Sequence, residues 1–268
     1  MTARGFDTTD LAVDVRGAVA VVKIDCGTPA NVVRPQTFAA LCSTLDALEA
    51  DSAVRAVVLG HKGRHFAGGA DFRFLETLKS APEDEVRDHI YRHFQGGVRR
   101  LYEFPKPVVA AISGAAITVG CEAALACDFR IVTEDAMFQE SWIRLGLIPP
   151  LGGLKMLAAT VGRGLACDMI LRGRPVGGAE AVRTGLAHEL VAAEELEARA
   201  FALAEELAAA APLAYAAAKA GIRDAMEWSL EDTFAAGLRE QCRMIASRDF
   251  AEGVDALVAR RRPVFEGR

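Results

Sequence analysis

Two glycine-containing loops, about fifty residues apart, carry the groups in this sequence that are best suited to chemistry. The first is His65-Phe-Ala-Gly-Gly-Ala-Asp71 and the second is Gly114-Ala-Ala-Ile-Thr-Val-Gly-Cys-Glu122. Each follows a β-rich apolar stretch and opens a predicted helix, where the first backbone N–H groups lack intrahelical partners and carry a partial positive charge. Two such helix starts that converge can hold a carbonyl oxygen as it becomes negative, so the pair of loops predicts an oxyanion hole.

Glu122 adds a carboxylate to this predicted site. It lies three residues after Val119, so on a helix it stands about one turn beyond that residue and faces the same space. The small residues around it let a ligand approach the main chain closely. A carboxylate beside an oxyanion hole indicates proton transfer.

Four segments between Leu11 and Phe265 together resemble the enoyl-CoA hydratase/isomerase (crotonase) superfamily. They are the Phe66-Ala-Gly-Gly-Ala-Asp71 loop, the stretch from Ala111 to Asp128, Phe138 with Gly146-Leu-Ile-Pro-Pro-Leu-Gly-Gly153, and the tail from Ser247 to Phe265. The resemblance implies an α/β fold, with a crotonase-like ββα spiral core and a helical C-terminal extension. It also implies an acyl-CoA substrate, in which coenzyme A is part of the thioester, and no permanently bound cofactor. The reaction is a separate question, because one scaffold hosts many chemistries.

The resemblance places the two oxyanion donors at the backbone N–H groups of Ala70 and Val119, with Glu122 as the general acid/base. Relatives usually carry glycine or another small residue at the second donor. Valine keeps the N–H donor but narrows the space around the thioester. The alternative is that Ile117 to Val119 only pack a helix start, and the surrounding match favours the oxyanion hole.

Hydratases of this superfamily usually have a second glutamate, and its position here is Trp142. We expect Trp142 to form an apolar wall or stacking surface for an acyl group, and its burial to raise the pKa of a nearby carboxyl. Glu140 could substitute for the missing glutamate, because residues two apart share a face in an extended segment. We favour a solvated or ion-paired Glu140. The nucleophilic aspartate of dehalogenating relatives falls on Pro150, so dehalogenation by that route is not expected.

Contacts to coenzyme A follow from the same resemblance. Relatives place the adenine against the main chain that matches Ala67 and Gly68 here. Arg34 is the nearby cation for the phosphates, although a solvated helix-start arginine is the alternative. Lys219 and the triplet Arg260 to Arg262 are further candidates, from the same or a neighbouring subunit.

Three other reactive residue types in these loops have simpler interpretations. Asp71 is expected to cap the following helix, with its carboxylate accepting hydrogen bonds from the first backbone N–H groups of that helix. His61 and His65 are expected to pack rather than to catalyse. Cys121 could be a nucleophile, but no histidine in the neighbouring sequence is evidently placed to activate it, so we favour an inert buried thiol.

Composition limits the classes of partner. The net charge of −5 and pI near 5.6 argue against general binding to nucleic acid or anionic membranes. No apolar run reaches the roughly twenty uncharged residues that a membrane span requires. Six cysteines without paired metal spacing, in a sequence without a signal peptide, predict no metal site and a cytoplasmic location.

Apolar periodicity predicts strands and helices that alternate in the first half and an almost wholly helical last third. The main expected elements are strands at Leu11–Val15, Val19–Ile24, Val54–Leu59 and Val108–Ile112, and helices at Pro35–Glu49 and Asp84–Tyr102. We expect a spiral core domain over residues 1–198 and a helical trimerisation region over residues 199–268. The resemblance implies a homotrimer or a hexamer made of two trimers.

Several functions remain open at this level. The leading hypothesis is a hydratase or isomerase that stabilises a thioester enolate with Glu122 as its single acid/base. Other enolate chemistry, such as decarboxylation or carbon–carbon cleavage, is the alternative among enzymes. A catalytically weak acyl-CoA binding member of the fold is the non-enzyme alternative, because Trp142 and Val119 both depart from the pattern.

Overall fold

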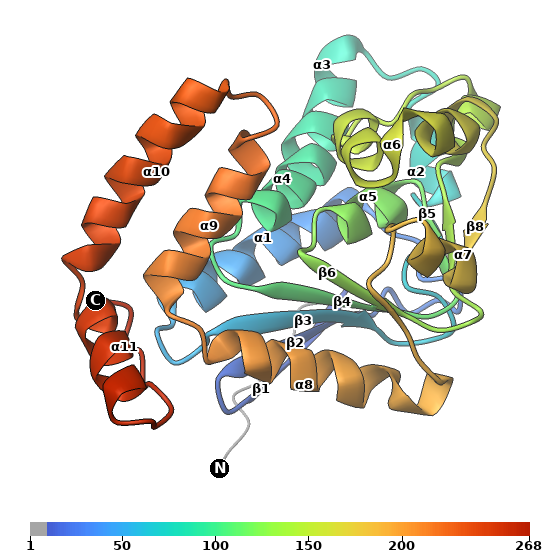
Figure 1. The fold of residues 1–268 in the computed structure, drawn as a ribbon. Coiled ribbons are helices and arrows are strands. Elements are labelled where there is room, and N and C mark those ends of the chain that lie inside the picture. The colour runs from blue at the N-terminus through green and yellow to red at the C-terminus, as the bar shows by residue number, and fades with distance from the viewer. Residues whose placement is uncertain (1–9) are drawn as a thin grey trace.

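A six-stranded sheet forms the centre of the protein. The computed structural model describes residues 10–268, apart from the side chain of His89. The strand order is β1-β2-β3-β4-β6-β9 (Figure 1). The strands are β1 (Leu11–Arg16), β2 (Val19–Ile24), β3 (Ala56–His61), β4 (Val108–Ile112), β6 (Phe129–Val132) and β9 (Glu189–Leu190). β1 and β2 form an antiparallel hairpin, and each later pair is parallel.

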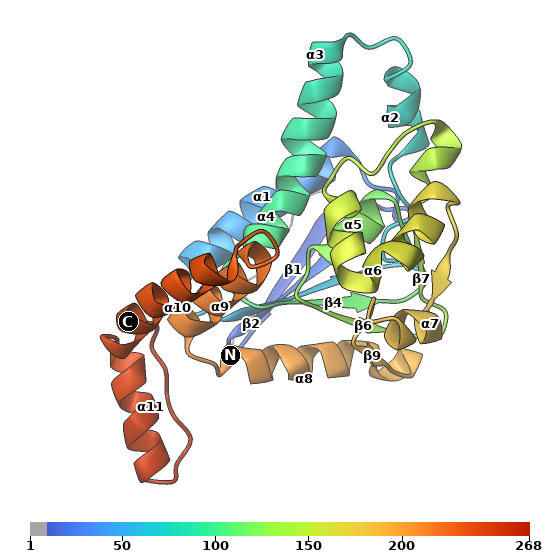
Figure 2. The same cartoon turned by 45° about the horizontal axis from the view of Figure 1, so that its top comes forward.

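Helices cover both faces of this sheet, which explains why its central strands are apolar on both sides. The larger core lies on the face covered by α1 (Pro35–Ala50), α4 (Gly96–Glu103) and α5 (Val119–Leu125). α8 (Leu196–Ala208) packs on the opposite face (Figure 2). The expected helix over 84–102 is formed by α3 (Glu83–Val86), the wider π-helical turns of η1 (Arg87–Gln95), and α4.

A second, three-stranded sheet stands beside the start of α5. It consists of β5 (Ala115–Ile117), β7 (Met137–Gln139) and β8 (Val176–Gly177). β5 pairs with β7 in parallel, so that Ile117 lies opposite Gln139. This pairing brings the residues that follow β7 next to the first turn of α5.

The remaining core helices connect these layers. They are α2 (Phe72–Thr77), η2 (Ser141–Leu145), α6 (Gly153–Leu171), α7 (Gly178–Arg183) and η3 (Ala193–Glu195). α6 is broken at Gly162, whose φ of 76° lies in the left-handed region that glycine adopts without a steric penalty.

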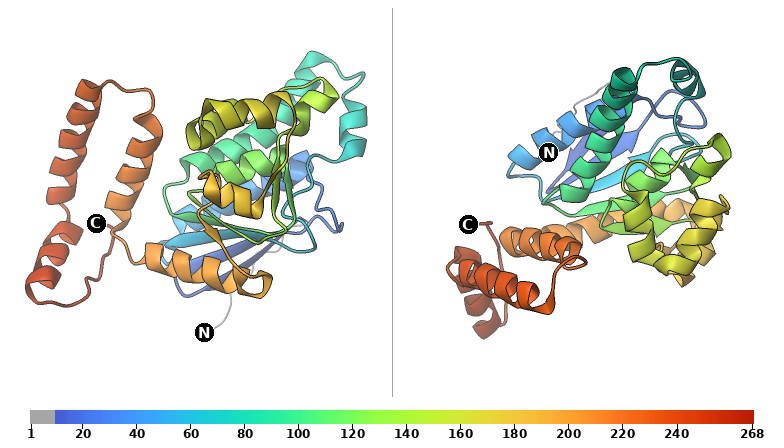
Figure 3. Two further views of the ribbon diagram at one scale, coloured as in Figure 1. Left: turned by 45° about the vertical axis from the view of Figure 1, so that its right-hand side comes forward. Right: turned by 90° about the horizontal axis from the view of Figure 1, so that it is seen from above.

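The last three helices form an arm that stands apart from the sheet layers (Figure 3). They are α9 (Pro212–Asp224), α10 (Leu230–Ile245) and α11 (Arg248–Val258). The predicted domain boundary between residues 198 and 199 lies inside α8, and the division into two domains stays a prediction.

Within residues 10–268 no single helix has the length and apolar composition to cross a membrane. One bent pair, Ala193–Ala208 with Pro212–Asp224 at 108°, meets these two criteria when its members are taken together.

Candidate active site

The two predicted loops are packed directly against each other. The Ile117 amide donates to the Ala67 carbonyl at 2.9 Å, and the Ala67 amide donates to the Ala115 carbonyl at 3.0 Å. The contact leaves no room for side chains: a Cβ on Gly120 would lie 2.6 Å from the Ala67 Cβ, and one on Gly69 would lie 2.9 Å from Thr118 Oγ1. The glycines of the two motifs are therefore explained by the close approach of the loops.

Both predicted oxyanion donors lie at this junction. The amides on either side are occupied, since Asp71 N donates to the Val33 carbonyl and Thr118 N donates to the Gln139 carbonyl. Within residues 10–268 the amides of Ala70 and Val119 have no hydrogen-bond acceptor. The arrangement thus supports the predicted pair of donors, and the oxyanion hole itself stays a prediction.

Thr118, the residue before Val119, has an unusual backbone. Its φ of 48° and ψ of −109° lie outside the regions that a threonine normally adopts, and its side chain is buried. Such a conformation costs on the order of 1–3 kcal/mol and is found most often at functional sites. No pattern in the sequence predicts it, because the strain comes from joining β5 to α5 in a single residue.

Glu122 occupies the first turn of α5 and is completely buried. Its Oε2 accepts hydrogen bonds from the amides of Leu151 at 2.8 Å and Gly153 at 2.7 Å, and its Oε1 accepts one from Trp142 Nε1 at 3.2 Å. Burial raises the pKa of Glu122 to about 7, although the three N–H donors act in the opposite direction. A carboxyl with this pKa can both accept and donate a proton near neutral pH.

Trp142 has a different effect from the one that the sequence suggests. Its side chain is only 5% exposed, and its indole N–H lowers the pKa of Glu122 by stabilising the carboxylate. The expected rise in the pKa of a neighbouring carboxyl is present at Glu122 and comes from burial. The hydrogen bond from the Trp142 ring lowers the same pKa. Its role as a wall for the acyl group stays a prediction.

The segment that carries Trp142 is fixed from both sides. Gln139 Nε2 and Arg144 Nη2 both donate to the Gly173 carbonyl, at 2.7 and 3.1 Å. Gly173 has a φ of 61°, and a Cβ there would lie 3.1 Å from Arg144 Nε. This turn therefore holds η2, and with it the indole, in place.

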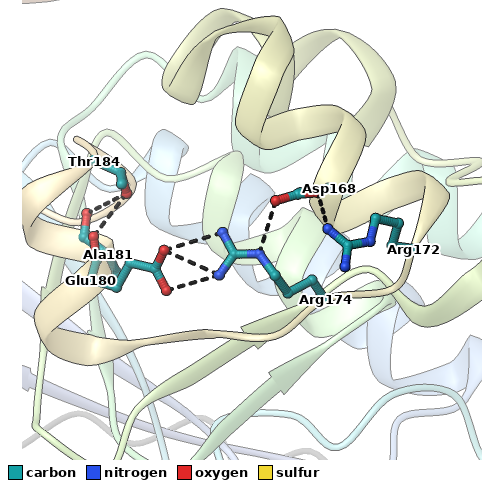
Figure 4. A network of polar contacts seen from close by, with 6 residues as sticks. All are labelled: Asp168, Arg172, Arg174, Glu180, Ala181 and Thr184. Carbon is teal, nitrogen blue, oxygen red and sulfur yellow. Dashed lines mark hydrogen bonds and ion pairs between the residues drawn. The ribbon is translucent and has the colours of Figure 1, made fainter.

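An ionic network holds the chain just after this turn (Figure 4). Arg174 forms ion pairs with Asp168 of α6 at 3.2 Å and with Glu180 of α7 at 3.1 Å, and Asp168 also pairs with Arg172. Glu180 additionally accepts, through its carbonyl, a hydrogen bond from the Thr184 hydroxyl. The network joins the end of α6 to α7 on the C-terminal side of the turn at Gly173.

Glu140 is neither solvated nor ion-paired, so the preferred expectation for this residue is wrong. Its side chain is completely buried, and neither carboxyl oxygen has a hydrogen-bond partner among residues 10–268. Burial and the nearby Glu122 carboxylate raise its pKa well above the usual value. The sequence could not show this, because a charged residue next to Ser141 and Arg144 is ordinarily exposed.

Two of the predicted coenzyme A residues, Ala67 and Gly68, lie within the first loop itself. The Gly68 amide donates to the Ala30 carbonyl at 2.9 Å, and a Cβ on Gly68 would lie 2.4 Å from that oxygen. Ala67 is buried beneath it. Arg34 forms an ion pair with the buried Asp10 while 45% of its side chain stays exposed. The structure thus gives Arg34 a partner within the chain, and its contact with phosphate stays a prediction.

The simpler interpretations of the remaining residues fit the structure. Asp71 caps α2, since its carboxylate accepts from the Arg73 amide at 2.7 Å. His65 Nδ1 accepts from the Ala115 amide at 3.0 Å and thereby joins the two loops. Cys121 is completely buried, and its pKa is raised well above the usual thiol value, which disfavours a nucleophilic thiolate.

Lys219, suggested for phosphate binding, is engaged elsewhere. Its ammonium forms a largely buried ion pair with Asp128 at 2.8 Å and also donates to the Lys106 carbonyl. Asp128 also accepts from the Val108 amide at 2.8 Å. Lys219 therefore fixes the start of the arm to the core.

Comparisons with known proteins agree with this fold. The family model described as enoyl-CoA hydratase/isomerase matches residues 14–268. The chain is 36% identical over 262 residues to a probable enoyl-CoA hydratase of Rhizobium meliloti (strain 1021), covering 96% of this chain and 98% of that protein. It is 30% identical over 265 residues to the 2,3-dehydroadipyl-CoA hydratase of Escherichia coli (strain K12), covering 97% of this chain and 100% of the relative.

A solved structure gives the same result. The crystal structure of an enoyl-CoA hydratase from Bacillus anthracis superposes with a TM-score of 0.90 at 28% identity, covering 97% of this chain and 100% of that one. The chain therefore belongs to the enoyl-CoA hydratase/isomerase family of the crotonase superfamily. The α/β fold with a helical C-terminal region is confirmed, and the protein is an enzyme of a family that acts on acyl-CoA.

Proposed function

We propose that this enzyme stabilises the enolate of an acyl-CoA thioester at the amides of Ala70 and Val119, with Glu122 as its single general acid/base. The observation that carries this proposal is the state of Glu122. Its carboxylate is buried, held by three N–H donors, and has a pKa of about 7, within one helical turn of the free Val119 amide. Electrostatic stabilisation of the oxyanion and a base matched to neutral pH are the two parts that enolate chemistry needs.

The proposed reaction is isomerisation of a 3-enoyl-CoA in preference to hydration of a 2-enoyl-CoA. Hydration needs a water held by a second acceptor, and the position that the resemblance gives to a second glutamate is filled by Trp142, which donates its N–H to Glu122. One base is enough to take the proton from the α-carbon of the 3-enoyl thioester, which leaves a dienolate, and to return that proton to the γ-carbon. The named relatives are hydratases, so the two activities must be measured side by side.

The test is a panel of acyl-CoA thioesters, with mass spectrometry and optical assays to identify each product. We expect 3-enoyl-CoA isomerisation to exceed crotonyl-CoA hydration, and Trp142→Glu to increase hydration. Hydration by the wild type on the order of 10² per second or faster would contradict the preference, because that exceeds the median enzyme turnover. Binding without turnover of any thioester would instead identify an acyl-CoA binding protein.

The role of Glu122 is tested by Glu122→Gln. Loss of a positioned general acid/base costs about 10²- to 10⁴-fold in rate, and acyl-CoA affinity should change little. The matched control is Glu134→Gln, because Glu134 is exposed on the turn before β7. If Glu122→Gln retains the wild-type rate, the assignment of the active site fails.

A further inference from the structure

Glu140 is a completely buried ionisable group that the proposed reaction leaves unused. In native proteins a buried polar side chain almost always has a hydrogen-bond partner, so one with two unpartnered oxygens needs an explanation. Glu140 has no exposed surface, and neither oxygen has a partner in the described part of the chain. It follows β7 directly, and the bond from the Thr118 amide to the Gln139 carbonyl fixes it beside the start of α5.

The donors around the two glutamates are distributed very unequally. Glu122 receives N–H groups from Leu151, Gly153 and Trp142, all of which stabilise a carboxylate. Glu140 receives none from residues 10–268, although it is equally buried. An isolated carboxylate in such a place is very costly, and the usual outcome is that the group keeps its proton.

The ionisable neighbours of Glu140 reinforce this difference. Glu122 and Cys121, both on α5, are the titratable groups that face it, and the carboxylate of Glu122 opposes a second negative charge. The Cys121 thiol and the Trp142 indole favour the ionised form, but neither forms a hydrogen bond of normal geometry with it. The buried guanidinium of Arg130 on β6 donates instead to the carbonyls of Leu186, Ala124 and Cys127.

We propose that Glu140 is a positioning residue that keeps its proton at and somewhat above neutral pH, so that once Glu122 ionises the buried pair Glu122–Glu140 holds one proton and one negative charge, with the charge on Glu122. This inference rests on the proposed role of Glu122 and deepens it. Two carboxyl groups enclosed together cannot both ionise easily, because their negative charges repel. The three N–H donors to Glu122 decide that it is the group that ionises. Glu140 is then not a second catalytic base. It keeps the total charge near the oxyanion donors at one, since a second carboxylate there would oppose the developing enolate.

Infrared difference spectroscopy tests the proposal without any assay of activity. The spectrum of the wild type minus that of Glu140→Gln, recorded near pH 8, should show the C=O stretch of a protonated carboxyl and no carboxylate bands. The control, wild type minus Glu134→Gln, should show carboxylate bands, because Glu134 is exposed. Carboxylate bands in the Glu140 difference at this pH would overturn the proposal, whatever substrate the enzyme uses.

A second measurement uses the coupling between the two groups. Glutamine mimics a neutral acid, so Glu140→Gln should leave the pKa of Glu122, read from the pH profile of kcat/KM, within about half a unit of the wild type. Removal of a charged neighbour would instead lower that pKa clearly. In Glu122→Gln the protonated-carboxyl band should disappear at a lower pH than in the wild type, because the opposing charge is gone. A band that titrates at the same pH in both proteins would also contradict a shared proton.

Discussion

The indole N–H of Trp142 donates to Oε1 of the completely buried Glu122 at 3.2 Å. Trp142, which stands where the resemblance places a second glutamate, therefore hydrogen-bonds to Glu122. The contact stabilises the carboxylate and restricts its rotation, since Oε2 is already held by two amides of the 151–153 segment. Trp142 thus donates a hydrogen bond to Glu122. It does not supply the carboxylate acceptor with which a glutamate at this position could have held a water molecule.

The pH dependence should follow Glu122. Its pKa is raised to about 7, and it must be ionised to accept a proton from the substrate. We expect kcat/KM to be level above about pH 7 and to fall roughly tenfold per unit below it. A rate profile that stays flat from pH 5 to pH 8 would show that Glu122 is not the base.

Trp142→Phe should move this acid limb upward. A hydrogen bond to a charged group contributes about 1.5–3 kcal/mol, and 1.36 kcal/mol corresponds to one pKa unit, so the acid limb should move by roughly one to two pH units. The matched control is Trp228→Phe, because Trp228 is the other tryptophan of the sequence, lies between α9 and α10, and is not among the donors to Glu122. The measurement is the pH profile of kcat/KM for both variants, and equal profiles would disprove a role for the indole donor.

Gly153→Ala should lower kcat/KM by displacing the carboxylate of Glu122. A Cβ there would lie 2.8 Å from Oε2 and 2.9 Å from Cγ of Glu122, so the carboxylate must move. Misplacement of a reacting group by about 1 Å can cost on the order of 10²-fold in rate. Gly164→Ala is the control, because Gly164 also belongs to α6 and its added Cβ would have no atom of the described residues within 4 Å apart from its chain neighbours and the nearby backbone of its own helix. Steady-state kinetics should therefore show a large loss of kcat/KM for Gly153→Ala and little change for Gly164→Ala. Equal values for the two variants would contradict the role of this contact.

Glu140 should also make stability depend on pH. Its native pKa is raised above the ordinary 4.5, so between these two values the native state holds a proton that the unfolded state releases. Stability from this group is complete below about pH 4.5 and is lost as pH rises toward the native pKa, by about 1.4 kcal/mol for each pH unit in that interval. Glu140→Gln should remove this slope. Urea unfolding of both proteins at several pH values tests it, and parallel curves would contradict a raised pKa.

The exposed apolar surface of the arm (α9 to α11) predicts that the protein self-associates. Large apolar side chains on α10 and α11 are widely exposed, including Phe234 at 68%, Leu238 at 69% and Leu257 at 79%. We expect light scattering to give three or six times the chain mass of 28.6 kDa. Leu238→Glu should weaken the assembly, whereas Leu171→Glu, similarly exposed on α6, should not. A wild-type mass near 28.6 kDa at micromolar concentration would refute the prediction.

Local chemistry was sufficient to place much of the site. The strands β2 at Val19–Ile24 and β4 at Val108–Ile112 and the cap at Asp71 lie where apolar spacing and helix-start preferences put them. The position of Glu122 in the first turn of α5 follows from the same reasoning. These features depend on residues that are close in sequence, and short-range preferences are read directly from the order of side chains.

The state of the two glutamates was decided by the tertiary structure alone. The donors that hold Glu122 lie 20, 29 and 31 residues further along the chain, and nothing in the sequence pairs them with it. Glu140 has the residue type of a solvated surface group, yet the pairing of β5 with β7 encloses it beside α5. Burial and hydrogen-bond partners depend on which distant segments pack together, and in this protein they determine which carboxyl is charged.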